Sequence, residues 1–483
     1  MTNQITKGLK MAHFHSTVSR RDFMKALGLV GAGAGALGAA SPIFRDLDEV
    51  TASVSKDPYA RWWVKERDFE DITTPIDWNV FKAYNPATHP TTPSEFGPGG
   101  PVLSTARKVR QLDGVVNNWP GSTLRDLALD GATGGNYSGN QKWDGAGGTS
   151  PSSRGDGTRS APGPWQGTPE ENLQTCRAAA HFYGSPRCGA IEINEKTKKL
   201  FNSNVQWADI DKGTYDDKTD IYTIPNKCRW VLVWLTKQSF KMNQYITRSD
   251  PDDPWPNKVF RQGKAGENQA YSHAPQIRYQ VNRFITGLGY QCLKPSASGN
   301  VQFGVFAGLS EMGRAAMTIE PSYGMMVRYI DFAITDLPLA PTKPIDAGLR
   351  RFCHNCGTCA KVCPSGCQST EKDPYWETRD TYSNAGLQTW YIDWDKCIRW
   401  GGPWDCVNCQ TSCPFNHPTD AIVHPFVRST AAVTPLFNGF FASMENSFGY
   451  FRQLSADEHE DWWSRDLSSW KYDTLLGFGN PSW

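Results

Sequence analysis

The spacing of the cysteines constrains this chain more than any other feature of its sequence. Of the 13 cysteines, nine fall between residues 353 and 413, and the other four are scattered through the preceding part of the chain. Disulfide frameworks rarely crowd their cysteines in this way, whereas metal sites do. The crowded region is therefore predicted to bind metal.

Two cysteine runs make up this region. Residues 353–364 have the spacing C-x2-C-x2-C-x3-C-P, which is typical of bacterial ferredoxins, and the second run keeps C-x2-C-x3-C-P after a longer first gap. Zinc or disulfides are the alternatives, but paired zinc sites would show separated C-x2-C pairs, and the trailing prolines favour a ferredoxin. In two-cluster ferredoxins the fourth cysteine of each run binds the other cluster. The predicted ligands are Cys353, Cys356, Cys359 and Cys413 for the first [4Fe–4S] cluster, and Cys363, Cys397, Cys406 and Cys409 for the second.

The ninth cysteine of the region, Cys367, has no place in this scheme, and it is interpreted as a buried structural thiol. Two neighbouring clusters form a path for electrons. We therefore expect the part of the chain before the cysteines to contain the redox site where the path ends.

Residues 1–40 have the features of an export signal. The pair Arg20-Arg21 precedes an apolar run rich in glycine and alanine that ends at Ala40. A charged region, a short apolar region and small residues make a secretory signal, and the paired arginines indicate the twin-arginine route. A basic N-terminal helix is the alternative. The apolar run is shorter than a membrane-spanning helix requires.

The composition excludes two classes of protein. Fifty lysines and arginines against 49 aspartates and glutamates leave a formal charge of +1, so we expect no nucleic-acid partner held by bulk charge. No long apolar run follows residue 43, which excludes a membrane protein with several spanning helices.

Local patterns predict a mixed α+β fold with α/β-like alternation. Thr168 and Glu171 form a potential capping box for a helix that ends near Gly184. A second helix is expected to begin at Pro275 and to end at Gly287. The remaining expectations are a Gly/Ser/Pro-rich surface loop at 131–168, strands at 189–194 and 228–235, and a linker at 337–349.

Two cofactor motifs are absent from the sequence. No G-x-G-x-x-G follows a credible strand, so a Rossmann-type dinucleotide site is not supported. No D-x-H-x-x-G is present to supply a histidine ligand to a corrinoid cobalt, and the nearest approach, around His459, is interpreted as a solvated acidic stretch.

Taken together, these features resemble the catalytic subunit of corrinoid and iron–sulfur dependent reductive dehalogenases. The resemblance covers nearly the whole chain and includes Thr335–Asp346 before the first cysteine run and Phe437–Phe441 after the second. It implies a nitroreductase-like corrinoid-binding domain at 41–345, a bacterial-type two-cluster ferredoxin domain at 346–420 and a C-terminal segment, 421–483, that packs on the core. It also implies a base-off corrinoid with no protein ligand below the cobalt.

The resemblance further implies three catalytic residues. Tyr271 lies 19 residues before the tyrosine of Leu288-Gly289-Tyr290, the register of the proton donor in this family. Arg328 matches the basic residue that supports the donor, and Asn300 in Ser298-Gly299-Asn300 is a weaker match. Tyrosine is a poor acid at neutral pH because its pKa is near 10, and a neighbouring cation lowers that value.

The implied activity is the removal of chloride from a chlorinated hydrocarbon in organohalide respiration. Two electrons would pass through the clusters to the corrinoid cobalt, together with one proton. The implied partners are a small membrane anchor protein and an upstream electron donor, at the outer face of the cytoplasmic membrane. An exported electron-transfer subunit without corrinoid is one alternative. A corrinoid iron–sulfur epoxide reductase is another, although the export signal and the charge of +1 count against it.

Overall fold

The computed structural model describes residues 61–85, 87–88, 116–117, 119–122, 143–144, 164–246, 261–404, 406–417, 423–448 and 453–466. The predicted export signal and most of the predicted loop at 131–168 lie outside these residues. Helices and strands are mixed along the described chain, so the predicted α+β class is confirmed. Within that part, no helix combines the length and the hydropathy that a membrane span requires.

A four-stranded antiparallel sheet forms the centre of the larger lobe. Its order is β2 (Cys188–Glu192), β6 (Trp230–Lys237), β10 (Val327–Thr335) and β7 (Cys292–Leu293). Successive side chains of a strand point to opposite faces. In β6, Val233 accordingly faces one apolar cluster and Trp234 faces the other. The sheet is therefore buried on both sides, and β6 begins two residues later than predicted.

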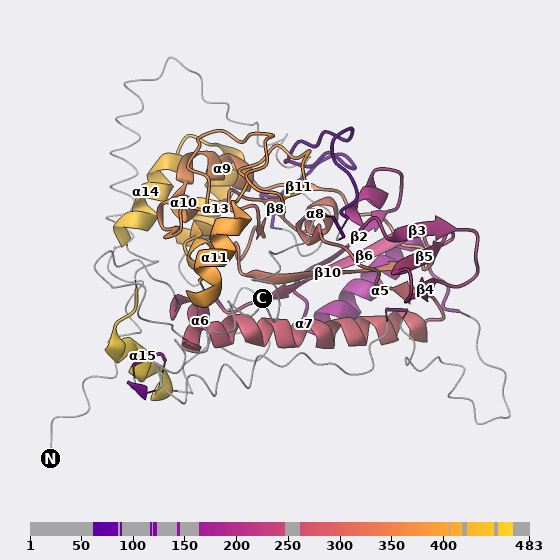
Figure 1. Ribbon diagram of the computed structural model, residues 1–483, viewed down its shortest axis with the longest axis horizontal. Helices are drawn as coiled ribbons and strands as arrows, with labels where there is room; N and C mark the ends of the chain where they lie inside the picture. Colours follow the sequence, from indigo (N-terminus) through magenta and orange to yellow (C-terminus); the bar gives the residue numbers. More distant parts are fainter. Residues whose placement is uncertain are drawn as a thin grey trace.

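Helices cover both faces of this sheet (Figure 1). On one face lie α5 (Pro169–Phe182) and the long α7 (Arg261–Gly287), and on the other lies α8 (Asn300–Phe306). The predicted capping box of α5 is confirmed: Thr168 Oγ1 accepts a hydrogen bond from the Glu171 amide, and the Glu171 carboxylate accepts one from the Thr168 amide. Gly184 follows the helix with a φ of 101°.

The predicted start of the second helix is wrong. Helix α7 begins at Arg261, so Pro275 lies inside it. Proline favours the first turn of a helix because it lacks an amide hydrogen, yet an interior proline is tolerated when packing holds the helix in place. The missing amide at Pro275 is the one that would bond the carbonyl of Tyr271, four residues earlier.

Smaller elements surround the central sheet. A second sheet contains β3 (Val205–Ala208), β5 (Ile221–Pro225) and β4 (Thr214–Asp216), and a hairpin pairs β8 (Glu311–Met312) with β9 (Thr318–Ile319). The remaining short elements of the larger lobe are η3 (Thr197–Leu200) and α6 (Phe240–Gln244).

The cysteine region is a compact group of short helices at one end of the sheet (Figure 1). The C-terminal helices α13 and α14 pack on α9. The elements of this end are α9 (Leu349–Cys356), α10 (Thr358–Lys361), α11 (Trp394–Trp404), α12 (Asn408–Thr411), η5 (Pro414–Asn416), α13 (Val423–Val433) and α14 (Asn438–Phe448). Helix α15 (Ala456–Trp463) lies apart from them, and its Trp462 packs with residues of α6 and α7.

The segment predicted as a linker, 337–349, is part of the core. Leu337, Leu339 and Leu349 are buried, and β11 (Ile345–Asp346) pairs with β1 (Lys65–Glu66). Three prolines favour a linker, but Leu337 and Leu339 belong to the apolar cluster between the sheet, α5 and α7, and Leu349 belongs to the cluster around the first set of cysteines. The predicted domain boundary at 345/346 falls inside β11.

A buried ion pair fixes α7 to the sheet and generates a stability prediction. Asp331 of β10 is fully buried; its carboxylate lies 2.6 Å from Arg278 Nε and 3.4 Å from Lys294 Nζ. Asp331→Ala should lower the free energy of unfolding by about 3–5 kcal/mol, because it leaves two partly buried cations without their anion. Denaturant unfolding followed by far-UV circular dichroism measures this change.

The matched control is Glu192→Ala, which removes an exposed ion pair with Arg229 at 2.6 Å. It should cost about 1 kcal/mol or less. Equal effects of the two substitutions would contradict the assignment of Asp331 as the anchor of α7.

Candidate active site and electron-transfer centres

The first set of predicted cluster ligands is enclosed by apolar side chains. Cys353 and Cys356 lie on α9, Cys359 lies on α10, and Cys413 directly precedes η5. The turn between α9 and α10 is made by Gly357 with a φ of 63°, a left-handed conformation that favours glycine. Cys359 interacts electrostatically with the other three thiols, so the structure brings the four together.

The second set lies beside the first. Cys363 follows α10, Cys397 lies on α11, and Cys406 and Cys409 flank the start of α12. Cys409 interacts electrostatically with Cys406 and Cys363 of its own set and with Cys359 of the first set. The two sets are therefore neighbours, as a path for electrons requires.

The donor chemistry of both sets fits iron–sulfur clusters. Burial raises the pKa of the Cys353 thiol to about 12, so without metal this thiol stays neutral. Among the described residues, no three His, Cys, Asp or Glu side chains are close enough together for a single metal ion. A cubane holds its ligand sulfurs farther apart than one ion does, and four thiolates are its usual ligands.

A buried arginine lies against the first set. Arg314 donates hydrogen bonds to the carbonyl oxygens of Cys353 (3.1 Å), Ser369 (3.2 Å) and Lys372 (3.2 Å), and its guanidinium stacks on Trp390. These contacts hold a positive charge beside the Cys353 and Cys359 thiols. That charge favours the anionic forms of a cluster bound there.

Arg328 occupies a β-bulge at the start of β10. Val327 pairs with Lys237 and Tyr329 pairs with Thr236, so Arg328 is the extra residue of the bulge. In a regular strand, Arg328 and Tyr329 would point to opposite faces, but the bulge lets both contact α7. The bulge therefore aims Arg328 at Tyr271.

Tyr271 lies on the face of α7 that meets this bulge. The Arg328 guanidinium carbon lies 4.7 Å from the centre of the Tyr271 ring, and the Tyr329 ring contacts it edge-on with centroids 6.3 Å apart. Tyr271 is 36% exposed, whereas Arg328 is largely buried. The structure thus places a cation on a tyrosine that remains open on one side.

Two further side chains hold Arg328 in place. Glu267, one helical turn before Tyr271, accepts an ion pair from Arg328 Nη1 at 2.9 Å. Gln410, which follows Cys409, has its Oε1 3.5 Å from the same nitrogen. Burial lowers the pKa of Arg328, but Glu267 and Tyr271 raise it by more, so the guanidinium stays charged.

Asn300 lies elsewhere, at the start of α8. It lines a cavity of about 470 Å³ together with Lys199, Trp394 and Ile398, the residue after Cys397. Neither Tyr271 nor Arg328 is among the described residues that line this cavity. The structure therefore brings Tyr271 and Arg328 together and places Asn300 in a separate space that borders α11.

Two curated relatives match this chain over nearly its full length. The trichloroethene reductive dehalogenase of Dehalococcoides mccartyi is 31% identical over 94% of this chain and 97% of its own length. The chloroethene reductive dehalogenase of another strain is also 31% identical, over 96% and 99% of the two chains. Residues 352–417 match the 4Fe-4S dicluster domain family.

The chain belongs to the reductive dehalogenases. These enzymes are oxidoreductases that act on carbon–halogen bonds, and the predicted family is confirmed. The catabolic reductive dehalogenase NpRdhA, solved in complex with 3-bromo-4-hydroxybenzoic acid, has a TM-score of 0.54 at 16% identity and shows the shared fold. The match covers 80% of this chain, which spans about half the length of that solved structure.

Buried polar atoms of this reductive dehalogenase fit a corrinoid. The macrocycle carries amide side chains at its edge, which donate and accept hydrogen bonds. Asn300 Oδ1, Arg328 Nε and Gln238 Oε1 are buried and have no hydrogen-bond partner among the described residues. An unsatisfied buried polar atom costs about 1–3 kcal/mol, so these atoms suit a polar-edged cofactor.

Three residues of the site were not predicted from the sequence. Glu267 could have been found, because it lies four residues before Tyr271 and shares its helical face. For Gln410, the sequence gives no indication of a role in the site except that it follows Cys409. Arg314 carries none, since its partners are backbone carbonyls from a distant loop.

Proposed function

We propose that this reductive dehalogenase removes halide from a small chlorinated hydrocarbon by the reaction R–Cl + 2e⁻ + H⁺ → R–H + Cl⁻. The contact between Arg328 and Tyr271, beside the second thiol set, carries this proposal because it combines a proton source with an electron path. Two matched relatives are named for trichloroethene and chloroethene, which supports a chlorinated hydrocarbon as substrate.

Electrons travel through two [4Fe–4S] clusters in a defined order. Gln410 joins Arg328 to the helix that carries Cys409, so the second cluster is the one next to Tyr271. The first thiol set is packed among apolar residues of α9 and α14, and none of its members contacts Arg328 in this way. The first cluster therefore receives electrons from the donor, and the second passes them to the site.

The cluster assignment predicts the iron content. Anaerobically purified protein should contain about eight iron atoms per chain, because each cubane holds four. Cys359→Ala and Cys409→Ala should each remove roughly half of that iron. Cys176→Ala, a buried thiol of the sheet core, should remove none. Stoichiometric zinc in place of iron would refute the assignment.

A corrinoid bound in this fold supplies the low-potential metal centre at which a carbon–halogen bond is reduced. Asn300, Gln238 and Arg328 would bind its amide side chains through buried atoms that have no hydrogen-bond partner among the described residues. No histidine is among the described residues that line the cavity beside Asn300, and the sequence lacks D-x-H-x-x-G. We therefore propose that the corrinoid is bound base-off.

The base-off state has a direct spectroscopic test. Electron paramagnetic resonance of the Co(II) protein should show no nitrogen splitting from a lower axial ligand. Splitting would contradict the proposal, and protein grown with ¹⁵N-histidine would then show whether the nitrogen is the protein's own.

Tyr271 supplies the proton. Its hydroxyl belongs to a half-exposed side chain on the rigid α7, so it can face a substrate while the ring stays packed. Proton loss leaves a phenolate, and the Arg328 charge 4.7 Å from the ring centre stabilises that anion. Glu267 keeps Arg328 in this position through its 2.9 Å ion pair.

Removal of the Tyr271 hydroxyl tests the proton donor. Tyr271→Phe should slow halide release by ~10²–10⁴-fold if proton transfer limits turnover, because a positioned acid is lost. Arg328→Leu should have a similar effect. The double variant should be little slower than either single variant, since both residues act on one phenolate. The assay uses an artificial low-potential donor and protein with full iron and cobalt.

The matched control is Tyr279→Phe on the same helix, whose hydroxyl accepts a hydrogen bond from Arg283 at 2.7 Å. It should leave turnover unchanged. Near-normal halide release by Tyr271→Phe would show that the proton donor is another residue or water.

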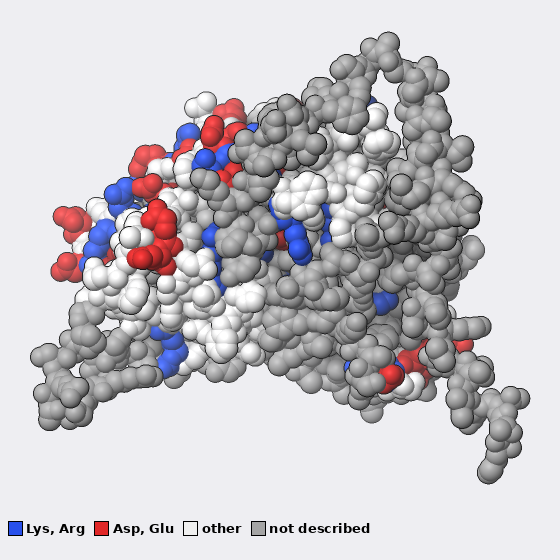
Figure 2. Space-filling model, turned by 180° about the vertical axis from the view of Figure 1, so that it is seen from behind, with Lys and Arg blue, Asp and Glu red and all other residues white. Residues whose placement is uncertain are grey.

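We further propose that the protein is exported and associates with the membrane. Arg20-Arg21 supports translocation by the twin-arginine route, and a small membrane anchor protein would then hold the enzyme at the outer face of the cytoplasmic membrane, near an electron donor. Figure 2 shows acidic and basic side chains intermixed at the end that carries β3, β4 and β5, which gives nucleic acid no basic face there. Protein in the cytoplasmic fraction of intact cells would contradict this location.

A further inference from the structure

Five thiols, not four, surround the position of the second cluster. Cys367 is buried, and its sulfur lies 3.3 Å from Cys363 Sγ. It is also within hydrogen-bonding reach of Cys397. A cubane with four protein ligands uses Cys363, Cys397, Cys406 and Cys409, so the fifth thiol needs its own explanation.

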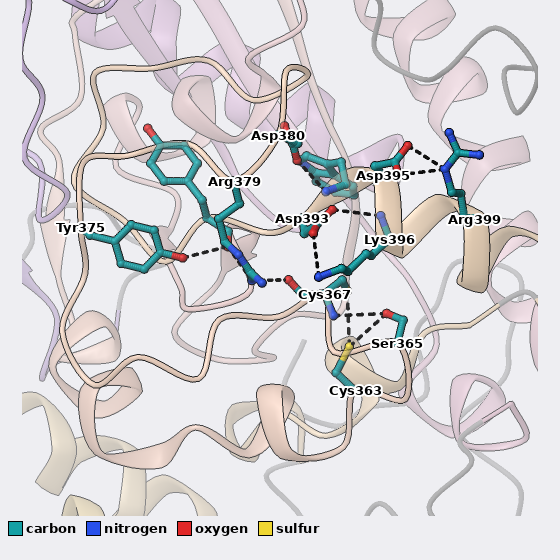
Figure 3. A network of polar contacts seen from close by, with 12 residues as sticks. Cys363, Ser365, Cys367, Tyr375, Arg379, Asp380, Asp393, Asp395, Lys396 and Arg399 are labelled. Atoms are coloured by element: carbon teal, nitrogen blue, oxygen red, sulfur yellow. Dashed lines mark hydrogen bonds and ion pairs between the residues drawn. The ribbon is translucent and has the colours of Figure 1, made fainter.

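The backbone of Cys367 is fixed by polar contacts on both sides (Figure 3). Its carbonyl oxygen accepts hydrogen bonds from Arg379 Nη1 at 2.6 Å and from the Asp393 amide at 3.0 Å. Its amide donates to Ser365 Oγ at 3.3 Å. The thiol is therefore held against Cys363 by the loop that joins α10 to α11.

Cys363 and Cys367 cannot both bind one cubane in this arrangement. Each iron takes one terminal thiolate, and thiolates on two irons of a cubane lie much farther apart than 3.3 Å. The ferredoxin spacing and the following Pro364 select Cys363 as the ligand. Cys367 then keeps its proton and presents an S–H group to a metal-bound thiolate.

We infer that Cys367 is a non-ligating thiol that donates a hydrogen bond to the Cys363 thiolate and raises the reduction potential of the second cluster. This inference rests on the proposed ligand set of that cluster. Hydrogen bonds to cluster sulfurs are one means by which a protein sets the potential. The reduced cluster carries one more negative charge, so a donor stabilises it more than the oxidised cluster.

The first cluster offers a matched contact. Thr358 Oγ1 lies 3.1 Å from Cys356 Sγ, so a hydroxyl occupies there the role that the Cys367 thiol has at the second cluster. Thr358→Val and Cys367→Ala therefore remove one donor each, from different clusters. The pair of variants identifies which reduction step belongs to which cluster.

The test is a redox titration of anaerobic protein followed by electron paramagnetic resonance. Cys367→Ala should keep all its iron and lower the potential of one of the two cluster steps. A fall of about threefold to tenfold in the equilibrium constant for reduction is expected, where tenfold corresponds to ~59 mV for one electron. Cys367→Ser keeps a donor and should recover most of the shift, and Thr358→Val should move only the other step.

The possible results distinguish a wrong set of cluster ligands from a hydrogen bond that has no effect on the potential. If the unchanged protein shows only one cluster, the ligand set itself is wrong. If both clusters are present but neither step moves in Cys367→Ala, the hydrogen bond has no role. If Cys367→Ala loses half of the iron while Cys363→Ala retains it, Cys367 is the ligand and the inference is overturned.

Discussion

The pairing of β10 with β6 is the interaction on which the site depends. It runs over the full length of both strands and is interrupted only at the bulge beside Arg328. Helix α7 lies across this pair and is tied to it by the buried Asp331–Arg278 contact. Because that contact fixes the position of α7 along the strand, it also decides which helical residue meets the bulge. Tyr271 meets Arg328 for this reason.

The same strand connects the site to the electron carriers. After β10 the chain passes through buried residues to β11 and then directly into α9, which carries the first two cysteines. The segment that looks like a linker is thus packed against the sheet and its helices at its start and against the thiols at its end. Gln410, next to Cys409, contacts both Gln238 at 2.9 Å and Arg328, and so connects the second set of thiols to the sheet. The distance between the second thiol set and Tyr271 is therefore set by packed structure on two sides.

Short-range sequence patterns predicted the features that depend on neighbouring residues. The capping box of α5 and the character of β6 follow from side chains a few residues apart, and each could be identified from spacing alone. The cluster ligands were assigned from the same kind of spacing and stay a prediction. Pro275 misled the prediction of α7 because tertiary packing holds a helix through a proline that would end an isolated one. The bulge at Arg328 and the contact with Gln410 depend on pairing between distant segments, which no local pattern records.

The N-terminal residues 61–85 have a consequence for how the chain folds. Thr74 contacts Arg350 across 276 residues, and Lys82 contacts Asn384 across 302 residues. β1 likewise pairs with β11. These partners leave the ribosome long after the segment itself, so it cannot reach its final position during the synthesis of the sheet. Contacts so distant in sequence form slowly, since a long loop must close first. Because its partners follow it so far along the chain, this segment is expected to dock only after the cysteine region has taken shape.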